Sequence, residues 1–183
     1  MGYLQKKLTS SQIIIIGFAS VILFGALLLM LPFATINGNG ARFKDALFTA
    51  TSAVCVTGLI VQDTATYWSY FGQGVILLLI QIGGMGVVTL AVAFTMLSGK
   101  RISLKQRSTM QEAISAPQVG GIVKFTGFIL IMTLIFELLG AVLMSPIFCK
   151  EFGLFRGIWY SLFHSVSAFC NAGFDLMGVK EPY

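Results

Sequence analysis

Two short segments of this chain end in residues whose backbone, more than their side chains, could bind an ion. The segments are ALFTATSAVCVTGL (46–59) and SLFHSVSAFCNAGF (161–174), which align at an offset of 115 residues. Six of the fourteen positions are identical: Leu47/Leu162, Phe48/Phe163, Ser52/Ser167, Ala53/Ala168, Cys55/Cys170 and Gly58/Gly173. Met30-Leu31-Pro32 and Met144-Ser145-Pro146 also correspond, at an offset of 114. This internal repeat predicts two equivalent structural units.

The end of each segment suits a dehydrated cation. Gly58 and Gly173 allow a positive φ and the close approach of several loops. A ring of backbone carbonyls can replace the hydration shell of an ion, and about four loops must converge to form it. A helix C-terminus just before the loop adds a partial negative charge. We therefore expect two filter segments, 54–58 and 169–173, whose backbone carbonyls bind the ion: Val54, Cys55, Val56, Thr57, Gly58, Phe169, Cys170, Asn171, Ala172 and Gly173.

The elements around these segments are membrane helices. The chain is 56% hydrophobic and 10% charged, whereas soluble domains are about a quarter charged. Its uncharged windows predict spans at 12–31, 70–98 and 125–148, each near or above the ~20 residues that cross a bilayer. A signal peptide is the alternative for the first, but its apolar stretch is longer than usual.

A helix predicted at 43–53 would rise only about 17 Å, too little to cross the membrane. It is either a re-entrant half-helix or a surface helix on the outer face, and the repeat, with its counterpart at 158–168, favours the first. Extended backbone at membrane depth is tolerated only inside protein or along a water-filled cavity, so re-entrant loops indicate a pathway.

The predicted fold class is an all-α membrane protein built from repeats of span, re-entrant pore half-helix and span, of the potassium-channel-like type. About one and a half repeats are expected: a first repeat at 1–98, a cytoplasmic loop at 99–124 and an incomplete second repeat at 125–183. Because the second copy stops before a closing span, the chain looks like a fragment of a longer protein.

Positive charges predict the orientation. The net charge is +5, and Lys100, Arg101, Lys105 and Arg107 crowd the end of the second span. The positive-inside rule accounts for this cluster without nucleic acid and places it, with the N-terminus, in the cytoplasm. A short interfacial helix is expected near Ser103, inside the loop.

Several other residues allow two interpretations each. Glu137 is an acid inside a span, so it is either a functional polar site or a packed polar group. His164 could contact the filter backbone, but a structural role is favoured. Gly83, Gly84 and Gly86 could form a hinge, although close helix packing is favoured.

Enzyme chemistry has no support in the sequence. Cys55, Cys149 and Cys170 form no CxxC or Cys/His metal pattern, which favours unpaired thiols. No Ser/His/Asp set, HExxH motif or Walker loop is present. We expect no cofactor and no catalytic residue.

Three stretches, TSAVCVTGLIVQDTATY, FGQGVILLLIQIGGMGVVTL and LFHSVSAFCNAGF, resemble the Trk/Ktr/HKT potassium transporter superfamily, specifically the N-terminal part of its KtrB-like membrane pore subunit. The resemblance implies potassium uptake through four repeats around a central pathway in the bacterial plasma membrane. It also implies a homodimer of the full-length subunit and a cytosolic nucleotide-binding regulatory ring, which the loop 99–124 could face.

The resemblance further implies that Gly58 and Gly173 are the filter glycines. Glycine rather than serine at 58 favours K+ over Na+ as the transported ion. The alternative is a truncated, non-conducting membrane scaffold or partner subunit.

Overall fold

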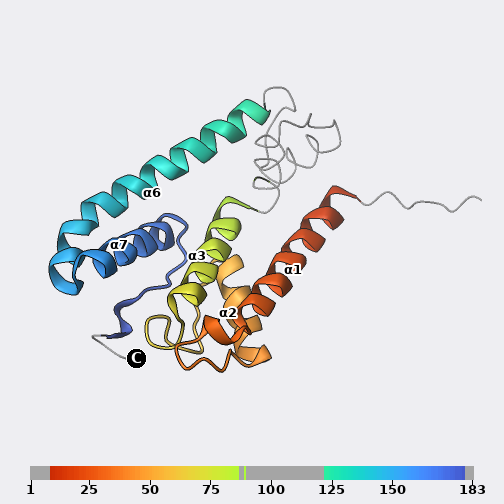
Figure 1. Ribbon diagram of the computed structural model, residues 1–183. Helices are drawn as coiled ribbons and strands as arrows, with labels where there is room; N and C mark the ends of the chain where they lie inside the picture. Colours follow the sequence, from red (N-terminus) through yellow and green to blue (C-terminus); the bar gives the residue numbers. More distant parts are fainter. Residues whose placement is uncertain (1–8, 87–88, 90–121, 180–183) are drawn as a thin grey trace, which may run out of the picture.

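The computed structural model describes residues 9–86, 89 and 122–179. The described residues fold as helices: α1 (Ser10–Leu29), α2 (Phe43–Val54), α3 (Tyr70–Met85), α6 (Ile122–Phe152) and α7 (Leu154–Phe169), with short 3-10 helices at Pro32–Ala34 and Met177–Val179 (Figure 1). Between these described helices, extended pairing is limited to an isolated bridge that joins Thr35 and Trp68. The predicted mostly helical fold is confirmed, and most of the predicted loop 99–124 lies outside the described residues.

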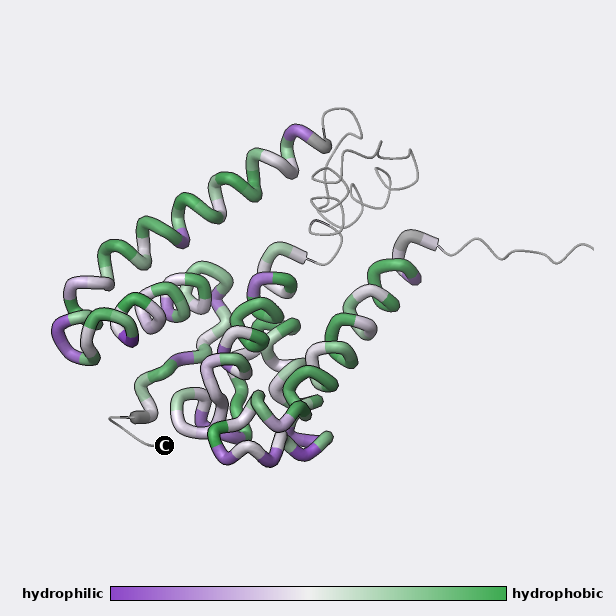
Figure 2. Tube along the Cα trace, viewed as in Figure 1, coloured by the Kyte–Doolittle hydropathy of each residue, from purple (hydrophilic) through white to green (hydrophobic). Residues whose placement is uncertain are grey.

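α1 and α6 are the long apolar helices. Two segments, Ser11–Leu29 and Lys124–Phe152, are long and apolar enough to cross a membrane. Large hydrophobic side chains on both face outward, such as Leu27 at 59% and Leu143 at 77% exposure. Figure 2 shows this apolar colouring along most of α1 and α6. An apolar exterior of this length suits the hydrocarbon of a bilayer.

α2 and α3 are shorter. α2 has 12 residues and packs against α1 and α3. Ser69 caps the start of α3, since its side chain accepts a hydrogen bond from the amide of Gly72, and the helix ends where Gly86 takes a φ of 80°. The predicted span 70–98 therefore breaks after Met85, because Gly86 leaves the helical conformation. Beyond Gly86, the predicted span lies outside the described residues, apart from Thr89.

α6 and α7 form a helical hairpin around one residue. Gly153, with a φ of 82°, joins the two helices. A Cβ at Gly157 would overlap the backbone of Cys149, so glycine lets the helices meet closely. α6 extends beyond the predicted span 125–148 and α7 begins earlier than 158, because backbone hydrogen bonds continue a helix past the residues that hydropathy selects.

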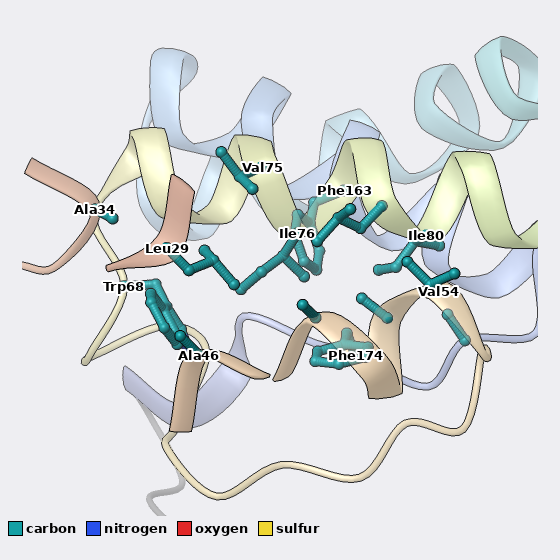
Figure 3. Packing of buried hydrophobic residues seen from close by; sticks show 14 of the residues in the cluster. Leu29, Ala34, Ala46, Val54, Trp68, Val75, Ile76, Ile80, Phe163 and Phe174 are labelled. Carbon is teal, nitrogen blue, oxygen red and sulfur yellow. The ribbon is translucent and has the colours of Figure 1, made fainter. Parts of the chain in front are cut away.

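The two halves of the molecule share one core. Ile76 and Ile80 of α3 point toward Phe163 of α7 and Phe174, which follows the second loop (Figure 3). These four side chains are at most 2% exposed. Each such burial stabilises the fold by about 1.5–3 kcal/mol. The segments that precede and follow the two loops are therefore held together by common packing.

Candidate functional site

The chain leaves α2 through a capping motif that turns it into a loop. Three amides donate hydrogen bonds to the last carbonyl oxygens of the helix: Cys55 to Thr51 over 2.8 Å, Val56 to Ala53 over 3.3 Å and Thr57 to Ser52 over 3.0 Å. The last two bonds form a Schellman motif, in which one left-handed residue ends the helix. Val56 is that residue, with a φ of 56°, and Gly58 follows at 71°.

α7 ends in the same way. Three equivalent amides donate to its last carbonyl oxygens: Cys170 to Val166 over 2.9 Å, Asn171 to Ala168 over 3.0 Å and Ala172 to Ser167 over 2.7 Å. Asn171 has a φ of 57° and Gly173 a φ of 76°. Each donor and acceptor lies 115 residues after its counterpart in the first segment. The repeat seen in the sequence therefore extends to the backbone conformation of both loops.

The left-handed residue is strained in the first loop only. A β-branched residue such as Val56 is an outlier at a positive φ, whereas asparagine, as at 171, is among the residues that adopt it. The cost for Val56 is on the order of 1–2 kcal/mol. Backbone strain of this kind is concentrated at functional sites, where surrounding structure maintains it.

The two loops touch at their glycines. A Cβ added at Gly58 would lie 2.6 Å from the carbonyl oxygen of Ala172 and 3.3 Å from Cα of Gly173. A Cβ added at Gly173 would lie 3.5 Å from Cα of Gly58, an ordinary contact. The structure therefore brings the two predicted filter glycines together and leaves no room for a side chain at Gly58.

A buried serine ties each loop back to its helix. Ser52 Oγ lies 2.9 Å from Thr57 Oγ1, and Ser167 Oγ donates to the carbonyl oxygen of Phe174 over 2.6 Å. Both serines are at most 4% exposed. The sequence repeat already pairs these serines, but their role as tethers required the structure.

The predicted filter segments begin inside the helices. Val54 and Phe169 are the last residues of α2 and α7, so the loops themselves start at Cys55 and Cys170. The side chain of Val54 is buried at 1% exposure, whereas Phe169 is 46% exposed and stacks on Phe136. Beyond the helices, the predicted filter segments consist of residues 55–58 and 170–173.

His164 holds the chain that follows the second loop. Its Nε2 accepts a hydrogen bond from the amide of Leu176 over 3.2 Å, so the ring hydrogen lies on Nδ1, which donates to the carbonyl oxygen of Tyr160 over 2.7 Å. The ring also stacks on Phe148 with centroids 5.0 Å apart. These contacts support the structural interpretation of His164.

Glu137 of α6 is buried next to α7 and α3. Its exposure is 4%, and its backbone carbonyl accepts a hydrogen bond from Ser165 Oγ over 2.6 Å. The carboxyl group lies beside the Gln81 side chain of α3. Glu137 Oε1 and Gln81 Nε2 are both buried without a hydrogen-bond partner among the described residues.

Sequence reasoning missed the glutamines of α3. Gln73 Oε1 accepts a hydrogen bond from Trp159 Nε1 of α7 over 2.8 Å, and its amide nitrogen donates to the carbonyl oxygens of Thr64 and Trp68. Gln73 and Gln81 are eight residues apart in an otherwise apolar helix, a spacing that places them near one face. The spacing of two polar residues in an apolar helix could therefore have indicated from the sequence that both glutamines have polar partners.

Comparison with known proteins defines the class. A sequence model of the TrkH family, described as a cation transport protein, matches residues 5–179. The chain therefore belongs to the TrkH family, as its loop motifs predicted. Membership places the chain in the membrane, in agreement with its two candidate membrane helices, and in a family of cation transporters.

Three relatives have more particular names. The chain is 46% identical to the potassium/sodium uptake protein NtpJ of Enterococcus hirae, over 95% of this chain and 39% of the relative. It is 45% identical to the Ktr system potassium uptake protein B of Bacillus subtilis, over 93% of this chain and 38% of the relative. It is 39% identical to the protein of the same name from Vibrio alginolyticus, over 90% of this chain and 36% of the relative. The chain thus spans less than 40% of the length of these relatives.

Proposed function

We propose that this chain contributes to potassium uptake across the bacterial plasma membrane, as part of the pore-forming subunit of a Trk/Ktr-type transporter. The observation that carries the proposal is the pair of loops with one backbone conformation, which meet at Gly58 and Gly173. The names of the relatives, which are potassium or potassium/sodium uptake proteins, support it.

In the proposed mechanism, backbone carbonyls of residues 54–58 and 169–173 replace the water around K+. The C-terminal ends of α2 and α7 lie just before these segments, and their partial negative charge attracts a cation. Glycine at 58 favours K+, and Na+ is the alternative ion. Further loops of the same kind complete the ring, since two loops cannot enclose an ion.

The proposed arrangement in the membrane follows the predicted repeats. α1, the predicted span 70–98 that begins with α3, and α6 cross the bilayer, whereas α2 and α7 are re-entrant half-helices, and the N-terminus is cytoplasmic in a multi-pass protein. The first repeat covers 1–98, the cytoplasmic loop 99–124 and the second repeat 125–183. The complete subunit forms a homodimer that a cytosolic nucleotide-binding ring regulates.

The test uses the complete open reading frame that encodes this chain, expressed in bacteria without their own potassium uptake systems. Restored growth at low potassium, with saturable K+ uptake, supports the proposal. Gly58→Ser should shift the preference from K+ toward Na+. Correct insertion into the membrane without uptake of either ion would instead favour the non-conducting scaffold, and unchanged selectivity in Gly58→Ser would refute the assignment of the filter.

A further inference from the structure

The last turn of α3 lies beneath both loops. Gly83 packs directly on Val54, and a Cβ at this position would overlap the carbonyl oxygen of Val54. Val54 is the last residue of α2, immediately before the first loop. The backbone of α3 therefore supports the base of the first loop without an intervening side chain.

The next residue of α3 supports the second loop. A Cβ at Gly84 would lie 2.5 Å from Sγ and 2.8 Å from Cβ of Cys170. Cys170 caps the end of α7, immediately before the second loop. Adjacent glycines of one helical turn thus contact the bases of both loops, so a shift of this turn would move both.

A polar pair extends this support to α6. Cys170 Sγ lies 4.0 Å from Gln81 Oε1, to which it donates a hydrogen bond. The amide nitrogen of Gln81 and Oε1 of Glu137, on α6, are buried without partners among the described residues. The Gln81 amide nitrogen is a hydrogen-bond donor and Glu137 Oε1 is an acceptor, so the two neighbouring side chains complement each other chemically. The Ser165 bond to the Glu137 backbone fastens α6 to α7 at the same level.

We propose that Gln81, Gly83, Gly84 and Glu137 are positioning residues that set ion selectivity by holding the bases of the two loops in register. The inference rests on the proposed potassium pathway. Groups that bind a ligand must be held within about 0.5 Å of their working geometry by the residues that support them. These four residues provide that support from α3 and α6 without contacting the ion.

The first test is Gly84→Ala in the complete transporter. The new methyl group pushes Cys170, and the K+/Na+ selectivity is expected to fall about tenfold, the lower end of the loss when a residue that supports a metal ligand is changed. The matched control is Gly74→Ala on the same helix, where the nearest atom is Cη2 of Trp159 at 4.0 Å. The control is expected to keep the wild-type selectivity.

A double-mutant cycle separates this contact from general damage. Cys170→Gly removes Sγ and Cβ, the two overlapping atoms, and leaves only Cα of residue 170 at an ordinary contact distance of 3.5 Å. Gly84→Ala should therefore change selectivity about tenfold in the wild type and scarcely at all in the Cys170→Gly background, because contacting residues are not additive. Equal effects in both backgrounds would refute the proposed contact.

The second test compares Glu137→Gln with Glu137→Leu. Glutamine keeps a polar group that can face the Gln81 amide, so selectivity should be kept, whereas leucine removes that polar group and selectivity should fall. If the Gly84→Ala protein does not reach the membrane, the comparison of the two Glu137 variants tests the proposal in its place. A purely structural role predicts that K+ and Na+ uptake fall together, in proportion to the amount of folded protein, and that result would overturn the inference. Failure of the wild type to take up K+ would instead refute the proposed function.

Discussion

Replacing Gly58 by alanine tests the contact between the two loops, because the chain contains two matched glycines. Gly38, Gly58 and Gly173 have φ values of 70°, 71° and 76°. Alanine in this left-handed conformation costs about 1–2 kcal/mol at each of them. The backbone cost of alanine is thus nearly the same at the three positions. Differences in stability between the three alanine variants therefore reflect what surrounds each added methyl group.

Those surroundings differ in a graded way. A Cβ at Gly38 meets nothing within 4 Å, and one at Gly173 meets Cα of Gly58 at 3.5 Å. One at Gly58 lies 2.6 Å from the carbonyl oxygen of Ala172, whereas a carbon–oxygen contact normally requires about 3.3 Å. The loops must therefore separate by about 0.7 Å, the difference between 3.3 and 2.6 Å. This exceeds the tolerance of about 0.5 Å expected for a binding site.

The assay combines thermal unfolding in detergent with K+ and Na+ uptake by cells that express the complete reading frame. Gly38→Ala should lose stability by the backbone cost alone and keep its selectivity. Gly58→Ala should lose a further 1–3 kcal/mol or so from overpacking and show altered selectivity, with Gly173→Ala between them. If Gly58→Ala behaves like Gly38→Ala in both measurements, the two loops do not meet as described.

Four further variants test the local geometry by thermal unfolding. Val56→Asn should raise stability by about 1 kcal/mol, because asparagine tolerates the left-handed conformation; a lower melting temperature would show that Val56 is not strained. Gln73→Leu should cost about 1 kcal/mol, since it removes the acceptor of Nε1 of the half-buried Trp159, and a neutral result would contradict that bond. Ser167→Ala and Ser52→Ala should each lose about 1 kcal/mol; no change in either would mean that the serines do not tether the loops.

Much of the helical framework could be predicted because it depends on local properties. The uncharged windows predicted long apolar helices, and α1 and α6 lie over two of them, with boundaries that differ by a few residues at each end. The family could also be predicted, since its motifs are contiguous in the chain. The break of α3 at Gly86 was only the less favoured hinge alternative, because a glycine in an apolar run is also compatible with a continuous helix.

The contacts around the loops could not be predicted from the sequence. Gln73 and Trp159 are 86 residues apart, and Gln81 and Cys170 are 89 residues apart. Hydrophobic periodicity indicates which face of a helix is buried but does not identify the partner it meets. His164 shows the same limit, since a lone histidine gave no sign of its two backbone partners.

The sequence by itself determined that this is an apolar, helical chain with a repeated segment, and it located Gly58 and Gly173 at equivalent positions of that repeat. Only the tertiary structure decided that the two glycines touch and that one turn of α3 supports both loops. The physical reason is that composition, periodicity and repeats are properties of neighbouring residues. Contacts between loops depend instead on how closely whole helices approach, which the side chains of distant segments decide together.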